Sequence, residues 1–120
     1  MYKDSIIHRG EIRKQKTAEG VLMQNLGAGK LMNALHWNMD DGSIVEWHQH
    51  PAEQFGYCIK GGFRIFYKTG DADVIEEYEI HGGDCYFIPP NVPHRFIALG
   101  ETEAIDIFNP IKVDIPKEIK

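Results

Sequence analysis

Three histidines and one glutamine stand at spacings that could bind a metal ion. His48 and His50 are separated by one residue, and Gln54 follows four residues after His50. His94 lies much further along the chain, at the end of the run YFIPPNVPH. Imidazole nitrogens are common ligands of divalent transition metals, and an amide oxygen can complete such a set. The sequence therefore predicts one metal site with these four side chains as ligands.

The elements around these residues predict how they converge. Residues 45–50 are rich in β-branched and aromatic side chains, which favours a strand. Side chains two residues apart in a strand point to one face, so His48 and His50 would lie about 6.5 Å apart along it. Pro51 has no N–H and ends this strand, and the prolines before His94 stiffen its approach. Taken alone, a His-x-His pair is more often two surface histidines.

The spacing around the two paired histidines resembles the first motif of the cupin family, G-x5-H-x-H-x3,4-E-x6-G. The match begins at Gly42, continues through the ligands His48, His50 and Gln54, and ends at Gly61. Gln54 stands where the motif has glutamate. The neighbouring Glu53 is the alternative ligand if the strand after Pro51 turns the side chain of residue 53, instead of that of residue 54, toward the metal.

The segment around the third histidine resembles the second cupin motif, G-x5-P-x-G-x2-H-x3-N. Gly83, Pro89 and His94 match it, while Asn91 replaces the glycine and Ala98 replaces the asparagine. Asparagine tolerates left-handed backbone angles almost as well as glycine does, so the turn is expected to be retained.

Length and patterning predict one all-β domain. The chain has 120 residues, enough for one core, and short strand-like runs alternate with turn signals from residue 20 onward. No helical period of useful length interrupts them. We predict a single-domain cupin, a small antiparallel β-barrel or jelly roll. Residues 1–18 would form an N-terminal arm or edge strand, residues 19–114 the barrel, and residues 115–120 a C-terminal tail.

Composition excludes several classes of partner. The net charge of -5 is spread along the chain without a basic run, so nucleic acid is not an expected partner. No apolar run reaches the roughly 20 residues of a membrane span, and the first residues lack the apolar core of a secretion signal. Cys58 and Cys85 do not make a disulfide framework. These features predict a cytoplasmic protein with a small-molecule substrate.

A carboxylate in the last predicted strand has two interpretations. Asp106 shares one strand face with Phe108 and lies among isoleucines, where burying a charge without a partner is costly. It could form a structural ion pair with Arg64, Arg95 or Lys112. It could instead act as a general acid and base beside the metal, because a buried carboxyl near a cation can be tuned to that task.

A narrower resemblance is carried by H-x-H-P-x-E-Q-x-G-Y, YFIPPNVPH and the ending D-x-F-x-P. These runs resemble the pectin-degradation cupins, which open the ring of 4,5-unsaturated uronates to give linear 5-keto-4-deoxyuronate. The resemblance implies that the metal ligands are His48, His50, Gln54 and His94. It also implies that Asp106 and Phe108 are the family's C-terminal acid and aromatic residue. Lys112 stands in the place of an arginine and lacks its bidentate fork.

The implied activity is metal-dependent ring opening of a sugar acid. Four neutral ligands would leave a divalent ion, Ni, Zn, Mn or Fe(II), with its full charge as a Lewis acid. Asp106 would move protons, Phe108 would form an apolar wall, and the substrate carboxylate would be neutralised by Lys112, Arg64 or Arg95. A non-haem iron dioxygenase and a non-catalytic sugar- or small-molecule-binding module are the alternatives.

Residues outside this set are expected to pack in the barrel or to lie on its surface, without a role in the metal site. Strand alternation places Trp47 and Tyr57 on the face opposite the metal ligands, and we interpret them as packing residues. His36 is expected to be a hydrogen-bonded histidine of the barrel rather than a fifth ligand. Apolar residues occur at both parities in the run FRIFY, so outward faces also need cover, and this predicts a homodimer.

Overall fold

The computed structural model describes residues 2–71 and 74–120. Residue 1, the first residue of the predicted arm, lies outside them. The described chain contains two short 3₁₀ helices, Lys3–Ser5 (η1) and Arg9–Glu11 (η2). Its strands are β1 (Gln15–Ala18), β2 (Val21–Ala28), β3 (Asn33–Met39), β4 (Ile44–His48), β5 (Glu53–Lys60), β6 (Gly62–Lys68), β7 (Ile75–His81), β8 (Cys85–Ile88), β9 (His94–Ala98) and β10 (Thr102–Asn109).

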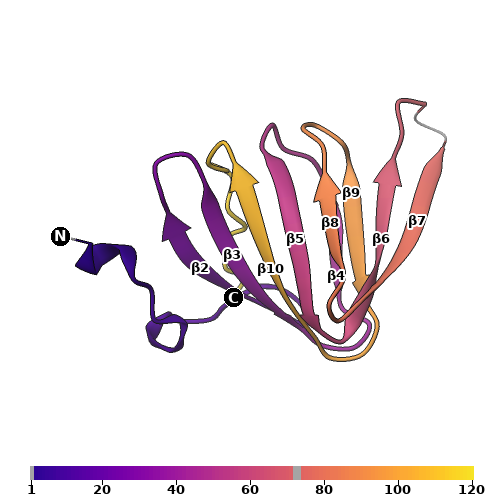
Figure 1. The fold of residues 1–120 in the computed structure, drawn as a ribbon. Coiled ribbons are helices and arrows are strands. Elements are labelled where there is room, and N and C mark those ends of the chain that lie inside the picture. The colour runs from indigo at the N-terminus through magenta and orange to yellow at the C-terminus, as the bar shows by residue number, and fades with distance from the viewer. Residues whose placement is uncertain (1, 72–73) are drawn as a thin grey trace.

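The strands form two sheets that face each other (Figure 1). One sheet has the strand order β1-β2-β3-β10-β5-β8, and the other has the order β4-β9-β6-β7. Every pair of neighbouring strands is antiparallel. The predicted all-β, single-domain jelly roll is therefore confirmed. Within the described residues, no helix has the length and apolar character needed to span a bilayer.

The core lies between the sheets, where strands such as β3 and β6 bury alternate apolar residues. Leu35, Trp37 and Met39 of β3 are buried, and Phe63 and Ile65 of β6 meet them from the opposite sheet. Burying one such side chain contributes about 1.5–3 kcal/mol before conformational entropy is counted. The intervening residues of these strands face outward, so one parity of each strand builds the interior.

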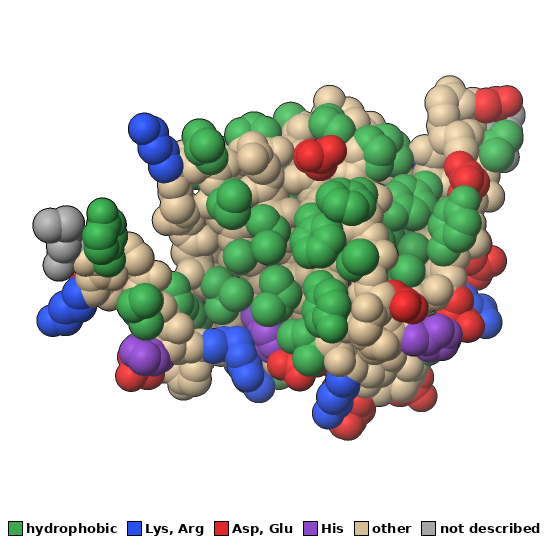
Figure 2. All heavy atoms as spheres, in the orientation of Figure 1, with side chains coloured by type: hydrophobic (Ala, Val, Ile, Leu, Met, Phe, Trp, Pro, Cys, Tyr) green, Lys and Arg blue, Asp and Glu red, His purple; other side chains and the backbone are tan. Residues whose placement is uncertain are grey.

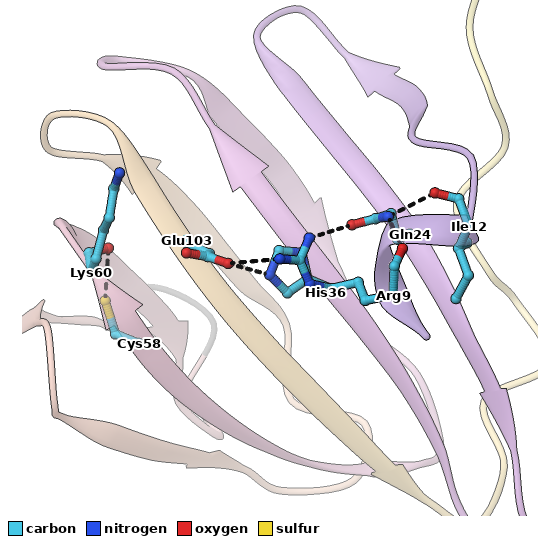
Figure 3. Close-up of polar contacts among 7 residues, drawn as sticks. All are labelled: Arg9, Ile12, Gln24, His36, Cys58, Lys60 and Glu103. Carbon is cyan, nitrogen blue, oxygen red and sulfur yellow. Dashed lines mark hydrogen bonds and ion pairs between the residues drawn. The ribbon is translucent and has the colours of Figure 1, made fainter. Parts of the chain in front are cut away.

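Polar contacts fix the N-terminal segment to the outer face of the six-stranded sheet (Figure 3). Gln24 Nε2 donates to the backbone oxygens of Arg9 at 2.9 Å and Ile12 at 2.7 Å. Next to this contact, His36 Nε2 lies 2.6 Å from Glu103 Oε2, which is 3.9 Å from an Arg9 nitrogen. His36 is therefore a hydrogen-bonded histidine on the side of β3 that faces away from the interior, as the prediction of a non-ligand role requires.

The C-terminal segment is irregular but fixed. Residues 110–120 contain no strand or helix. The backbone N–H of Ile119 donates to the Lys16 carbonyl at 2.7 Å, and Arg13 forms a bidentate pair with Glu118. The tail thus returns to β1.

The outer face of the six-stranded sheet is apolar. Figure 2 shows hydrophobic side chains gathered over β2, β3, β10, β5 and β8. The exposed large side chains of this face are Leu22, Tyr57, Ile59 and Phe87. Phe55, Ile105 and Ile107 lie among them and are half-buried.

Candidate metal centre

Three histidines converge inside the sandwich. His48 ends β4, His50 lies in the following turn, and His94 begins β9 directly opposite His48. One side-chain nitrogen from each ring lies within 4.8 Å of the other two, a grouping that could hold a metal ion. His50 and His94 are almost completely buried. The structure thus brings together the three histidines that the sequence selected. The predicted strand over residues 45–50 is wrong at its end, because β4 stops at His48 and His50 reaches the cluster from the turn.

Backbone carbonyls set the orientation of all three rings. The Nδ1 atom of each histidine lies 2.8 Å from a carbonyl oxygen two residues away along the chain, that of Glu46, Ala52 or Val92. A carbonyl can only accept, so each Nδ1 carries the hydrogen, and Nε2 of the neutral ring keeps a free lone pair. Metal-binding histidines are oriented in this way by hydrogen bonds to their other nitrogen.

The glutamine completes the donor set. Gln54 is buried on β5, and its Oε1 lies 3.0 Å from His50 Nε2. Both atoms present lone pairs, and two ligands at right angles around one ion, about 2.1 Å from it, would be about 3.0 Å apart. Among the described residues His94 Nε2 is buried and has no hydrogen-bond partner. These donors therefore fit a divalent ion.

Burial keeps the histidines neutral. Desolvation and the nearby His48 together lower the pKa of His94 to about 3, and desolvation is the larger cause. Desolvation also lowers the pKa values of His48 and His50, and the Lys112 ammonium adds to both effects. At neutral pH all three rings are unprotonated, which is the form that binds metals.

The turn that presents His94 adopts the predicted conformation. Asn91 has a φ angle of 60°, in the left-handed region, and its N–H donates to the His50 carbonyl at 2.8 Å. Asparagine therefore performs here the role of the glycine in the second motif, as the sequence predicted. The same hydrogen bond joins the two ligand-bearing turns.

A cavity of about 310 Å³ opens beside the histidines. Much of its wall is apolar, with Trp37, Phe63 and Phe96 among the lining residues. The polar side chains that line it are Glu46, His48, Gln54, Tyr86, Asp106 and Lys112. An apolar pocket with a few converging polar groups is typical of a small-molecule site.

Asp106 lies in this cavity as a buried carboxyl. Tyr86 donates its hydroxyl to Asp106 Oδ1 at 2.6 Å. Within the described chain, no ion pair of 4.0 Å or less includes Asp106, so the alternative of a structural ion pair finds no partner. Burial raises the pKa of Asp106, and hydrogen bonds from Tyr86 and Gln54 partly offset that effect.

Phe108 and Lys112 also face the interior. Phe108 packs edge-on against the His50 ring at a centroid distance of 5.4 Å. Lys112 is only 6 % exposed, and its Nζ lies 5.2 Å from the centre of the Phe108 ring. The backbone N–H of Lys112 donates to Asn33 Oδ1 at 2.8 Å, which holds this part of the tail over β3. Burial lowers the pKa of Lys112, while Asp106 opposes that shift.

The two predicted arginines do not reach the cavity. Arg64 is exposed on β6, with its Nε 3.7 Å from Glu77 Oε1. Arg95 lies on β9 with its Nε 2.9 Å from Glu46 Oε1. Both residues alternate with buried neighbours that face the core, so their own side chains must point to the other face. Of the predicted carboxylate-binding cations, Lys112 is the one that the structure places at the cavity.

Sequence reasoning did not place Trp47 or Tyr86 in the cavity wall. Trp47 was interpreted as a packing residue, yet it lines the cavity, because the pairing of β4 with β9 shifts register between Val45 and His48. Tyr86 was not selected at all. The alternation of β8 could have found it, since Tyr86 shares its face with the buried Ile88.

The chain matches the model of the cupin domain family over residues 35–108. Among solved structures, KdgF from Halomonas sp. is 23% identical, with a TM-score of 0.79 over 91% of this chain and 96% of that chain. An RmlC-like cupin from Shewanella frigidimarina NCIMB 400 is 25% identical, with a TM-score of 0.72 over 86% of this chain and 87% of the other. A variant of Bacillus subtilis oxalate decarboxylase shares 18% identity and a TM-score of 0.77, and 85% of this chain covers 28% of that one. These structures share the fold, and the family model covers more than half of the sequence. The chain therefore belongs to the cupin domain family.

Proposed function

We propose that this cupin is a metal-dependent enzyme that opens the ring of 4,5-unsaturated uronate monosaccharides to give 5-keto-4-deoxyuronate. The observation that carries the proposal is that a buried acid and a buried cation line the same cavity. Asp106 and Lys112 both line the cavity beside the histidine cluster. The structural similarity to KdgF and the motifs of the pectin-degradation cupins support the same assignment.

The side chains that would hold the ion are His48, His50, Gln54 and His94. All four are neutral donors, so a bound divalent ion, Ni, Zn, Mn or Fe(II), would act as a Lewis acid with its full charge.

The reaction needs one proton to be moved. The hemiacetal hydroxyl loses its proton, the bond between carbon 1 and the ring oxygen breaks to give an aldehyde and an enolate, and the enolate gains the proton at carbon 4 to become the ketone. The atoms balance without a co-reactant. Asp106 is the group that we assign to this transfer, because burial raises its pKa and so favours a carboxyl that can both accept and return a proton.

The other cavity residues bind and orient the substrate. Lys112 offers an ammonium group to the sugar carboxylate, inside a largely apolar wall where the charge pair is weakly screened. Phe108 supplies a flat apolar surface beside the ligand cluster. Together they would hold the carboxylate end of the sugar away from bulk water.

Turnover of a 4,5-unsaturated galacturonate monomer tests this function. Loss of the conjugated ultraviolet absorbance is followed for the wild type, His94→Ala and Asp106→Asn, with spontaneous opening as the blank. Acceleration by the wild type that both variants lose is the expected result. Arg64→Gln is the matched control, because Arg64 lies outside the cavity, and it should keep wild-type rates. Absence of acceleration by metal-loaded protein would refute the proposal and direct attention to oxygen uptake or to ligand binding without turnover.

We also propose that the protein is a homodimer joined through the apolar outer face of the six-stranded sheet. Leu22, Tyr57 and Phe87 are exposed on that face. Hydrophobic side chains gather over it (Figure 2). Glu53 and Lys60 are exposed at opposite ends of β5. A two-fold axis that sets β5 antiparallel to its copy would therefore place unlike charges together around an apolar centre.

A further inference from the structure

Tyr86, Gly56 and Asp106 lie in one row across three neighbouring strands. β5 runs between β8 and β10, and Gly56 is paired with Tyr86 on one side and with Asp106 on the other. Adjacent strands are about 4.8 Å apart, so the backbones of Tyr86 and Asp106 are separated by roughly 9.6 Å. The tyrosine side chain bridges this distance by lying across β5.

The absence of a side chain at Gly56 makes this crossing possible. A Cβ atom at Gly56 would lie 1.9 Å from Tyr86 Cζ and 2.2 Å from its hydroxyl oxygen. Such an atom would occupy the space that the ring now fills. Gly56 is therefore required because the Tyr86 ring packs against its backbone. The same ring carries the hydroxyl that contacts Asp106.

Aromatic contacts hold the Tyr86 ring in place, and its hydroxyl donates a hydrogen bond to Asp106. Its ring makes edge contacts with Phe63 at a centroid distance of 5.4 Å and tilted contacts with Phe96 at 5.8 Å. Its hydroxyl donates to Asp106 Oδ1 at 2.6 Å. A hydroxyl has one hydrogen to donate, and here it holds Oδ1 of a carboxyl that lines the cavity.

We propose that Tyr86 is the positioning residue for Asp106, and that Gly56 provides the space through which it acts. This inference rests on the proposed function, in which Asp106 moves the proton. The hydroxyl bond to Oδ1 restrains the orientation of the carboxyl beside the cavity during both removal and return of the proton. Tyr86 itself stays protonated throughout, because burial and the nearby carboxylate raise its pKa well above the usual value.

The kinetic test is Tyr86→Phe, which keeps the ring and its contacts and removes only the hydroxyl. In metal-loaded enzyme we expect kcat to fall about 10- to 100-fold with KM changed less than about twofold. Adding Tyr86→Phe to Asp106→Asn should cost no further activity, because the hydroxyl acts only through the acid. Equal rates for Tyr86→Phe and wild type, or an additive loss in the double variant, would overturn the inference.

A second readout does not depend on turnover. In metal-free protein at one fixed pH, the carbon-13 resonance of the Asp106 carboxyl should shift in Tyr86→Phe. It should not move in Tyr78→Phe, which removes an exposed hydroxyl bonded to Glu76. Gly56→Ala should reproduce the shift by displacing the Tyr86 ring. If Gly56→Ala does not fold, the result for Tyr86→Phe alone tests the inference.

The two proposals fail in different ways. If wild-type protein does not open the uronate but the Asp106 resonance still moves in Tyr86→Phe, the positioning role stands and the substrate assignment is wrong. If the wild type is active and neither kcat nor the resonance responds to Tyr86→Phe, the ring-opening function stands and the positioning role is refuted.

Discussion

The rings of His48 and His94 face each other across β4 and β9, with their centroids 4.2 Å apart. The two residues are direct cross-strand partners in the four-stranded sheet, although they lie far apart in the sequence. The register of this one strand pair therefore decides whether the ligand cluster exists. A shift of one residue would turn the two rings to opposite faces.

Removal of one histidine should abolish tight metal binding. We expect His94→Ala to weaken the affinity for Ni²⁺ or Zn²⁺ by more than about 100-fold. Loss of a residue that only hydrogen-bonds to a metal ligand typically costs about 10- to 100-fold in affinity, and loss of the ligand itself should cost more. Isothermal titration of metal into metal-free protein measures the change. His81→Ala is the control, since His81 is exposed on β7 and its ring faces Glu79. Equal affinity in His94→Ala and wild type would contradict the assignment of this ligand.

Acidification should destabilise the metal-free protein through its buried histidines. The folded pKa of His94 is about 3, below the unfolded value of 6.5, so the unfolded chain binds more protons between these limits. The free energy of unfolding should therefore fall as the pH drops from about 6.5 toward 3, by up to about 1.4 kcal/mol per pH unit for one proton. Urea denaturation between pH 5 and 7, where carboxylates contribute little, should show a shallower slope for His94→Gln. An unchanged slope would contradict this origin.

The buried lysine should control substrate affinity. Lys112→Ala should raise KM for the uronate about tenfold or more, because the substrate carboxylate would lose its charge partner, and Lys112→Arg should restore most of that affinity. Steady-state kinetics separate this effect from kcat. Lys60→Ala, an exposed residue on β5, should leave KM unchanged. A KM in Lys112→Ala equal to that of the wild type would exclude Lys112 from carboxylate binding.

One charge on the outer sheet face should prevent dimerisation. Tyr57→Glu should shift the mass measured by light scattering from that of a dimer to that of a monomer, because a buried, unpaired carboxylate in the interface is costly. Val113→Glu is the matched control, since Val113 is 86 % exposed and lies in the C-terminal segment instead of on this face. A monomeric wild type at micromolar concentration would refute the proposed interface.

The sequence by itself determined the class of fold and the three histidines. Strand parity and the turn residues are local properties, so alternation predicted the all-β chain, and the proline-rich turn with Asn91 predicted where His94 begins its strand. The strand predicted over residues 45–50 ends at His48, however, and His50 lies in the following turn, so simple alternation did not determine how these two rings converge. The family motifs then joined these local segments into one predicted site, which the geometry of the rings supports.

Only the tertiary structure decided which side chains share the cavity. Arg64 and Arg95 were plausible by charge, but the face that each strand buries sends them outward. Trp47 enters the cavity because a register shift between β4 and β9 breaks simple alternation. The contact of Tyr86 with Asp106 depends on three strands lying side by side and on a missing side chain between them. The alternation of side chains along one strand can be predicted from the sequence, whereas the pairing of strands distant in the chain is set by the packing of the whole domain.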